Sequence, residues 1–402
     1  MAKRYLFTPG PTPVPHEVLE AMSRPIIHHR SSDFREILER CLERLAEVYR
    51  TASDVLVYTA SGTGGMESAV SNLTGPGDRV VVVSSGFFGE RWVGMAENFG
   101  CEVAAIAYDW GETPTADDLA GRLSELGGAK VVFLTHSETS TGVIADVQAL
   151  AAVAKEAEAL VVVDAVSSLG AVPLETDAWG LDSVISGSQK ALMTPPGLAT
   201  VSVSQDAWAA VKQDAKGTGR TGKAGTASVG AAESAPKRYY FDWTQTKERQ
   251  DQFDPAFTPA VSIVVGLDVA LGILLDEGLE QAFERHTRLG RACRAGVKAM
   301  GLELFSPDDD RSAVVTAINA PEGIDSSELV QTLRDRQGIV LAPGQGPLKG
   351  KVFRIGHIGY YDVFDITTAL AGVELVLAEL GADIERGAAI TAALEAFEHS
   401  RV

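Results

Sequence analysis

The feature that most constrains the fold is a series of seven short, largely apolar runs in the first half of the chain. They are VLVYT (55–59), RVVVV (79–83), EVAAI (102–106), KVVFLT (130–135), LVVVD (160–164), DSVIS (182–186) and ATVSV (199–203). Stretches with helical periodicity separate several of them, at 64–72, 89–99, 117–126 and 147–158. Apolar strands joined by helices predict an α/β fold with a mostly parallel seven-stranded sheet that is covered on both faces.

A second α/β pattern follows in the last third of the chain. It consists of a strongly helical stretch (262–300), strand-like runs at 313–318, 339–342 and 352–356, and helical patterns near 326–337, 363–380 and 384–402. A Gly-, Ala-, Ser- and Thr-rich stretch predicts a flexible surface insertion at 216–233. We therefore expect an N-terminal segment (1–20), a large domain (21–275) and a smaller C-terminal α/β domain (276–402).

Composition disfavours two classes of partner. The 402 residues carry a formal net charge of -19 at pH 7, whereas nucleic-acid binding needs a basic face. We expect no membrane association, because no apolar stretch reaches the roughly 18 residues that a spanning helix needs. The cysteines lie too far apart for a metal or disulfide pattern, which favours buried free thiols and a cytoplasmic location: Cys41, Cys101 and Cys293.

Two residues at the ends of predicted strands indicate a cofactor site. Asp164 ends LVVVD, where a lone buried carboxylate is costly, and Lys190 follows the turn SGSQ after the next strand. Taken singly, such residues are most often a turn aspartate and a solvated lysine. Together, at one edge of a parallel sheet, they offer a desolvated amine and a carboxylate. Pyridoxal 5'-phosphate (PLP) requires this pair, the amine for its aldehyde and the carboxylate for its pyridinium nitrogen.

The stretch YTASGTGGMESAV predicts a turn that binds an anion. A strand leads into SGTGG and a helix follows, so that free backbone N–H groups and the positive helix end face outward. The pattern matches neither Walker A nor GxGxxG, which disfavours a nucleotide. The candidate contacts to a cofactor phosphate are Ser61, Gly62, Thr63 and Gly64.

Three further residues lie after or within predicted strands. Phe88, after RVVVVSS, is placed to stack on a cofactor ring, a contact worth about 0.5–1.5 kcal/mol beyond burial, although core packing is its usual role. Thr139, in HSETSTG, is placed to hydrogen-bond a ring hydroxyl, unless the segment is only a series of turns. Arg354 lies inside the apolar run VFRIG, where a guanidinium needs an anion such as a substrate carboxylate.

These motifs, in this order and spacing, resemble the class V aminotransferases of PLP fold type I, and in particular the alanine/serine–glyoxylate (serine–pyruvate) branch. The resemblance covers nearly the whole chain, from TPGPTPVP through HSETSTGV, VVVDAVSSLG and SGSQKALMTPPG to FRIGHIG. It implies that Lys190 forms a Schiff base with PLP, that Asp164 contacts the pyridine nitrogen and that Phe88 stacks on the ring. Gly62 and Thr63 would bind the phosphate.

The resemblance also implies roles for the remaining candidates. Gln189 would join the phosphate contacts, Thr139 would reach the ring, and Arg354 would bind the substrate carboxylate. The family is dimeric, with the active sites at the subunit interface, so Thr258 in FDPAFTPAVS is expected to contact the phosphate of the partner subunit. His28, in HHR, belongs to the N-terminal stretch that approaches the substrate.

The expected activity is a ping-pong transfer of an amino group from alanine or serine to a 2-oxo acid, glyoxylate or pyruvate, with glyoxylate as the best acceptor. In this scheme the released Lys190 moves the substrate proton, and Asp164 keeps the ring nitrogen protonated. No metal is expected.

Four other functions are compatible with parts of this pattern. A phosphoserine or aminoethylphosphonate aminotransferase of the same fold would differ only in its side-chain pocket. A non-catalytic binding protein of this fold is disfavoured by the intact Lys190, Asp164 and Arg354. Cysteine desulfurases and selenocysteine lyases typically have His before the lysine and a late reactive Cys, whereas this chain has Gln189 and no cysteine after Cys293. A nucleotide-binding α/β protein would need phosphate motifs that the sequence lacks.

Overall fold

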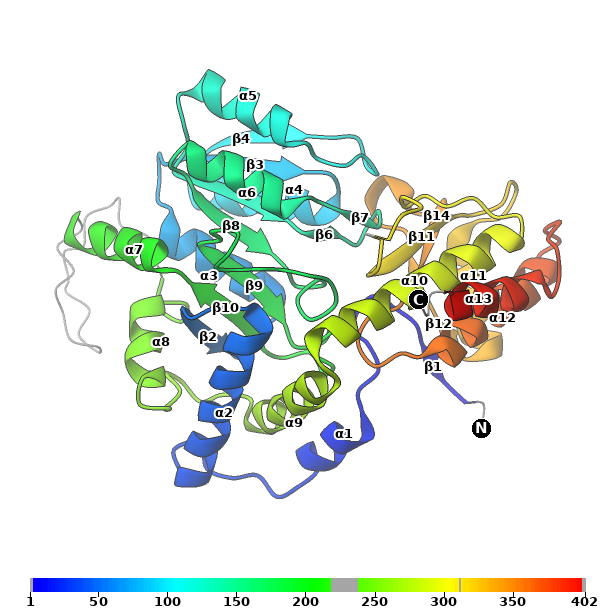
Figure 1. Cartoon of the computed structure of the whole chain (residues 1–402), viewed down its shortest axis with the longest axis horizontal. Coiled ribbons are helices and arrows are strands. Elements are labelled where there is room, and N and C mark those ends of the chain that lie inside the picture. The colour runs from blue at the N-terminus through cyan, green and yellow to red at the C-terminus, as the bar shows by residue number, and fades with distance from the viewer. Residues whose placement is uncertain (1–2, 218–237, 311, 400–402) are drawn as a thin grey trace.

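A sheet of seven strands forms the centre of the larger part of the molecule (Figure 1). The computed structural model describes residues 3–217, 238–310 and 312–399. In spatial order the strands are β2 (Asp54–Tyr58), β10 (Ala199–Val203), β9 (Ser183–Gly187), β8 (Leu160–Asp164), β5 (Val131–Thr135), β3 (Arg79–Ser84) and β4 (Glu102–Ala107). Neighbours pair in parallel except at β10, which is antiparallel to β2 and β9. The predicted fold class is confirmed.

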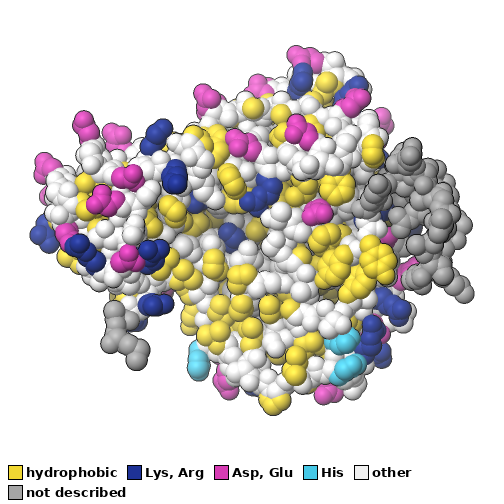
Figure 2. All heavy atoms as spheres, turned by 180° about the vertical axis from the view of Figure 1, so that it is seen from behind, with side chains coloured by type: hydrophobic (Ala, Val, Ile, Leu, Met, Phe, Trp, Pro, Cys, Tyr) yellow, Lys and Arg dark blue, Asp and Glu magenta, His cyan; other side chains and the backbone are white. Residues whose placement is uncertain are grey.

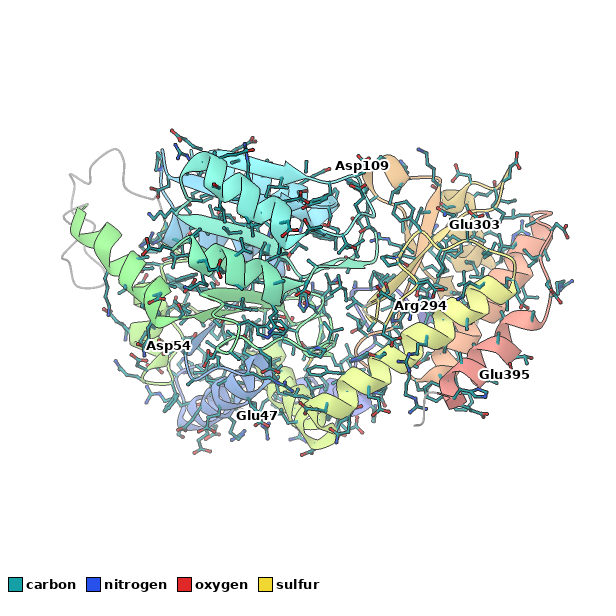
Figure 3. The ribbon with its side chains drawn as sticks, turned by 45° about the horizontal axis from the view of Figure 1, so that its top comes forward. Glu47, Asp54, Asp109, Arg294, Glu303 and Glu395 are labelled. Atoms are coloured by element: carbon teal, nitrogen blue, oxygen red, sulfur yellow. The ribbon has the colours of Figure 1, made fainter. Side chains whose placement is uncertain are left out.

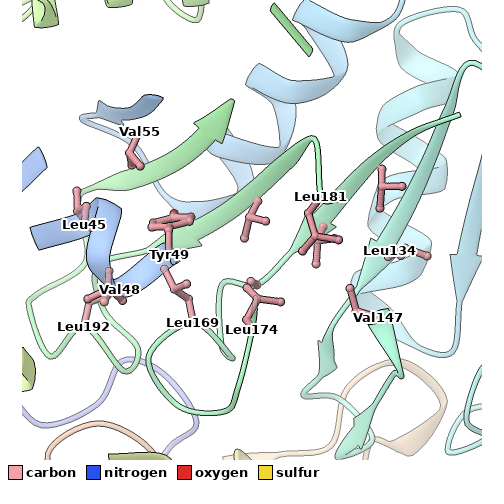
Figure 4. Close-up of a cluster of buried hydrophobic side chains, with 14 of the residues drawn as sticks. Leu45, Val48, Tyr49, Val55, Leu134, Val147, Leu169, Leu174, Leu181 and Leu192 are labelled. Atoms are coloured by element: carbon pink, nitrogen blue, oxygen red, sulfur yellow. The ribbon is translucent and has the colours of Figure 1, made fainter. Parts of the chain in front are cut away.

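Helices cover both faces of this sheet because successive strand residues point to opposite sides. In β3, Val81 and Val83 belong to one hydrophobic core, and Val80 and Val82 belong to the other. The first core, part of which is drawn in Figure 4, is closed by α2 (Ser32–Tyr49), α5 (Ala116–Leu126), α6 (Val147–Glu156) and α9 (Val261–Glu277). The second is closed by α3 (Gly62–Leu73), α4 (Phe87–Asn98), α7 (Gln205–Gly217) and α8 (Trp243–Gln250).

The smaller part of the molecule packs helices against an antiparallel sheet of three strands, β11 (Val315–Asn319), β14 (Val352–Gly356) and β13 (Ala342–Pro343). Its helices are α10 (Leu279–Ala299), α11 (Ser326–Thr332) with the π-helical turn η1 (Leu333–Gln337), α12 (Val363–Glu379) and α13 (Ala388–His399). Short elements lie in the connections: α1 (His16–Met22), the paired strands β6 (Ser137–Glu138) and β7 (Val143–Ile144), and the 3-10 turn η2 (Gly346–Leu348).

Two segments join the two parts of the molecule. Helix α10 contributes Phe283 to the core of the large part and Leu289 to that of the small part, and Figure 1 shows it running from one to the other. At the N-terminus, β1 (Tyr5–Leu6) pairs in parallel with β12 (Ile339–Val340), and Phe7 enters the core of the small part. The domain ranges stay a prediction, because a packed helix rather than a linker connects the two cores.

Acidic side chains are spread over the surface of both parts, and Figure 3 labels Glu47, Asp109, Glu303 and Glu395 among them. Cys41 and Cys293 are buried as predicted, whereas Cys101 is partly exposed because it precedes the edge strand β4. No helix in the described part of the chain is long and apolar enough to cross a membrane. The predicted insertion lies outside the described residues, except for its first two positions, where α7 ends.

Candidate active site

A pocket lies at the edge of the large sheet where the parallel strands end. The segments that line it follow β2, β3, β5, β8 and β9, which converge because carboxyl ends of parallel strands share one edge. Its lining consists of Ser61, Gly62, Thr63, Met66, Phe88, Arg91, Ser137, Asp164, Val166, Ser167, Gln189 and Lys190.

Lys190 lies in the turn after β9, beneath the N-terminal segment. Its Nζ donates a hydrogen bond to the carbonyl oxygen of Pro9 at 3.0 Å. The hydroxyl of Thr12 donates to the Lys190 carbonyl at 2.9 Å, which fixes this segment over the lysine. A Cβ atom on Gly10 would lie 2.2 Å from Nζ, so only glycine permits this close approach. The segment after β1 and the lysine turn are therefore held together.

Burial and neighbouring charges shift the pKa of the Lys190 amine. Burial lowers the pKa of Lys190 to about 8; Asp164 opposes this shift, and Arg354 and Arg91 add to it. A substantial fraction of the amine is thus neutral slightly above neutral pH, as a nucleophile requires.

Asp164 ends β8 with its side chain in the same pocket, 5% exposed. Its Oδ1 accepts a hydrogen bond from the backbone N–H of Val166 at 2.9 Å. The pKa of Asp164 is raised to about 6, mainly by burial and with a smaller contribution from the Glu138 carboxyl. The hydrogen bond from Val166 and the positive charges of Arg91 and Lys190 oppose this shift. A cationic N–H partner would lower this pKa again, because an adjacent positive charge favours the carboxylate.

Residues of α3 and α4 form one wall of the pocket. Arg91 and Phe88 lie one helical turn apart on α4, and the guanidinium lies 4.8 Å from the centre of the Phe88 ring. Arg91 Nη1 also donates to the hydroxyl of Thr63, in the first turn of α3, at 2.8 Å. Gly62 begins α3 against the loop after β8, since a Cβ there would meet Val166 at 2.5 Å. The predicted phosphate turn and the predicted stacking residue are thus in contact through Arg91.

Two buried polar atoms of the pocket residues have no hydrogen-bond partner within the described part of the chain. They are the side-chain oxygens of Gln189 and Ser137. Such atoms are costly unless a ligand or water satisfies them. With the amine of Lys190, the carboxylate of Asp164 and the face of Phe88, they suit a flat, polar, aldehyde-bearing ring such as PLP. The residues present therefore fit this cofactor.

Arg354 projects from β14 of the small part and is 5% exposed. Its Nη2 donates to the carbonyl of Pro343 and its Nη1 to the carbonyl of Thr139, both at 2.7 Å. Burial lowers the pKa of Arg354 to about 10, and the Glu138 carboxyl opposes that shift. Carbonyl oxygens orient the guanidinium but carry no full charge, which leaves it able to bind an anion. The predicted ring contact Thr139 is buried beside Arg354, and neither of these two residues lines the pocket.

Two predicted site residues lie on the surface instead. His28 and Thr258 are exposed and do not line the pocket of their own chain. The His28 ring lies 4.6 Å from that of His29 and accepts a hydrogen bond from the N–H of Arg30 at 3.2 Å. Arg30 forms an ion pair with Asp254 at 3.4 Å, which ties the segment of His28 to the segment that leads to Thr258.

Comparison with known proteins places the chain in a family. The model of the family "Aminotransferase class-V" matches residues 4–348. The "Serine--glyoxylate aminotransferase" of Methylorubrum extorquens is 35% identical, over 97% of this chain and 95% of that protein. The crystal structure of ureidoglycine-glyoxylate aminotransferase from Bacillus subtilis covers 99% of both chains with a TM-score of 0.89 and 31% identity. The chain belongs to the class V aminotransferases.

One further relative carries a different name. The "Soluble hydrogenase 42 kDa subunit" of Anabaena cylindrica is 41% identical over 99% of each chain. Within residues 3–217, 238–310 and 312–399, the structure contains no group of three or more His, Cys, Asp and Glu side chains that could hold a metal ion.

The predicted family, enzyme class and fold type of this class V aminotransferase are confirmed, and its family uses PLP. Sequence reasoning missed five lining residues: Met66, Arg91, Ser137, Val166 and Ser167. A usable signal existed for some of them. Arg91 is three positions after Phe88, and both face one side if the helix predicted at 89–99 begins two residues earlier, as α4 does. Val166 follows Asp164 by two positions at the same strand end.

Proposed function

We propose that this class V aminotransferase binds PLP through Lys190 and moves the amino group of alanine or serine to a small 2-oxo acid, glyoxylate or pyruvate. The observation that carries the proposal is that Lys190 and Asp164, 26 positions apart, line one buried pocket with shifted pKa values. Strongly shifted pKa values within a cleft favour a catalytic role over a structural one.

PLP, when bound, supplies an aldehyde that binds amines and a protonated ring that accepts electrons from the substrate. Lys190 would bind that aldehyde, and its free amine would later take the proton from the substrate Cα at Nζ. The pKa of about 8 supports this role, since an amine of this basicity both accepts and returns a proton near neutral pH. Asp164 would hold the proton on the ring nitrogen.

The remaining cofactor contacts follow from the walls of the pocket. Ser61, Gly62 and Thr63 begin α3, where backbone N–H groups and the positive helix end favour a phosphate. Gln189 would complete this cradle with its side chain. Phe88 would cover one face of the ring.

Arg354 is proposed to bind the substrate carboxylate. Its buried guanidinium is already oriented by two carbonyl oxygens, so little side-chain entropy is lost on binding. Thr139 is proposed to hydrogen-bond the ring hydroxyl. Like Arg354, Thr139 does not line the pocket, so that contact would require a shift of the segment.

The protein is proposed to be a homodimer whose second subunit completes the rim of the site. Thr258 and His28 would then act on the partner subunit, which agrees with their exposure on linked segments. Next to Thr258, Phe257 stacks on Tyr240 at 4.9 Å, and Tyr239 is 72% exposed. Figure 2 shows hydrophobic side chains gathered over the face seen from behind. Such exposed aromatic groups favour a protein interface.

Glyoxylate is the proposed acceptor because the names of the Methylorubrum and Bacillus relatives both specify it. The test pairs alanine, serine and phosphoserine with glyoxylate, pyruvate and 2-oxoglutarate, using purified protein reconstituted with PLP. We expect the highest kcat/KM with alanine or serine and glyoxylate. Preference for phosphoserine and 2-oxoglutarate would overturn the substrate assignment, and absence of a visible cofactor band after PLP addition would overturn the site itself.

A further inference from the structure

Glu138, at the end of β6, is a carboxylate that the proposed reaction does not use. It is 1% exposed, and its two oxygens accept four hydrogen bonds. The N–H groups of Phe88 and Gly89 donate to Oε2 at 2.8 and 3.1 Å. The N–H and the hydroxyl of Ser140 donate to Oε1 at 3.2 and 2.5 Å. Burial raises the pKa of Glu138, but all four partners are donors, and this arrangement favours the ionised form.

These contacts cap α4 from a separate segment. The residue that precedes the helix, Gly86, has no side chain to cap it. The first three N–H groups of α4 instead reach Ser140 and Glu138, since Phe87 N donates to the Ser140 hydroxyl at 3.2 Å. A Cβ on Gly86 would lie 2.6 Å from Glu138 Cγ, so a glycine at this position allows the Glu138 side chain to approach the start of α4. The start of α4 is therefore positioned by the loop after β5.

Two proposed contacts of the site depend on this connection. Helix α4 carries Phe88, the proposed ring contact. The residue after Glu138 is Thr139, whose carbonyl accepts from Arg354, the proposed carboxylate ligand. The negative charge of Glu138 also opposes the lowering of the Arg354 pKa by burial and so favours its cationic form.

We infer that Glu138 is a positioning residue that holds Phe88 against the cofactor ring and orients Arg354 toward the substrate. The inference rests on the proposed function, because it presumes that the pocket binds PLP. Glu138 acts through these two residues. Loss of its carboxylate would displace their contacts and would not remove a group that takes part in the reaction.

The test is a double-mutant cycle on cofactor affinity, read by PLP titration of the cofactor-free protein. Glu138→Gln is nearly isosteric, but its amide NH2 group cannot accept from α4. We expect PLP to bind about threefold to tenfold more weakly, which corresponds to the loss of one ring-stacking contact. Phe88→Ala should weaken PLP by a similar factor. In the Phe88→Ala background, Glu138→Gln should then change PLP affinity by less than about twofold, because its effect passes through Phe88.

Two further measurements separate positioning from general stability. Glu138→Gln should raise KM for the amino acid more than it lowers kcat, since Arg354 binds the substrate carboxylate. Thr115→Ala is the matched control: it removes the cap of α5, where the Thr115 hydroxyl accepts from Asp118 N at 3.2 Å, and the pocket is not lined by either residue. It should leave PLP affinity unchanged.

Additive effects in the cycle, or unchanged PLP affinity in Glu138→Gln, would overturn the inference. If Glu138→Gln does not fold, Ser140→Ala replaces it in the same cycle, because it removes one donor to Glu138 and the acceptor for Phe87. Wild-type protein that fails to bind PLP would instead refute the proposed function, so the two failures are distinguishable.

Discussion

The floor of the pocket (Lys190 and Asp164) and its proposed rim (His28 and Thr258) differ in how completely one chain supplies them. On the floor, Asp164 is buried and Lys190 is half-buried, and both are held by backbone partners from the same chain. On the rim, His28 and Thr258 are exposed and lie outside the pocket of their own chain. The difference teaches that the edge of one parallel sheet brings the proposed cofactor contacts together, whereas the proposed contacts of His28 and Thr258 would need a second subunit.

Loss of Lys190 should have the largest effect. Lys190→Ala removes both the proposed attachment to PLP and the base, and we expect turnover to fall by at least about 10⁴-fold. The visible band of the bound cofactor should disappear as well, which absorbance spectroscopy would show. Lys155→Ala, which removes a lysine whose amine pairs with Asp182 and not with the pocket, is the control and should keep the band. Turnover retained in Lys190→Ala would refute the role proposed for Lys190.

Arg354 tests the contribution of the small part to the site. Arg354→Lys keeps a positive charge but loses the planar pair of donors, so we expect kcat/KM for the amino acid to fall about tenfold to a hundredfold, mainly through KM. Arg294→Lys is the matched control, because Arg294 is equally buried (3% exposed, against 5%) but pairs with Asp308. Equal losses in both variants would show that Arg354 has only a structural role.

Mixed subunits test whether the rim is completed by a partner. Thr258→Ala should weaken PLP about tenfold if its hydroxyl binds the phosphate. Subunits of Thr258→Ala and Lys190→Ala are then mixed and allowed to exchange. If Thr258 acts across the interface, each mixed dimer gains one site with both native residues, and tight PLP binding returns. No recovery in dimers shown to have exchanged would place the action of Thr258 within its own chain.

The smallest expected effect is the pH dependence of PLP capture. A lysine with a pKa lowered to about 8 is protonated below that pH, and the neutral amine is the reactive form. The rate at which cofactor-free protein acquires the visible band should therefore rise with pH up to about 8 and then level off. A rate that still increases through pH 10 would show that Lys190 has the basicity of a solvated amine.

The sequence was most predictive where local pattern and function coincide. All seven runs formed strands of the sheet, and residues placed at strand ends, such as Asp164 and Lys190, met in the pocket. Continuous apolar runs predict buried strands, and a position directly after such a run predicts the edge of the sheet, so both can be recognised without tertiary contacts. The same rules did not reveal Arg91, whose role depends on contacts with Thr63 and Phe88 that only the packing of α3 and α4 creates.

The amino-acid sequence by itself determined the fold class, the family and the lysine–carboxylate pair, because strand periodicity and strand-end position are properties of contiguous residues. The tertiary structure decided which groups surround that pair. It brought the N-terminal Pro9 to Lys190, Arg354 to Thr139 and Glu138 to α4. These are contacts between distant segments, and their geometry depends on how helices and the small part pack on the sheet.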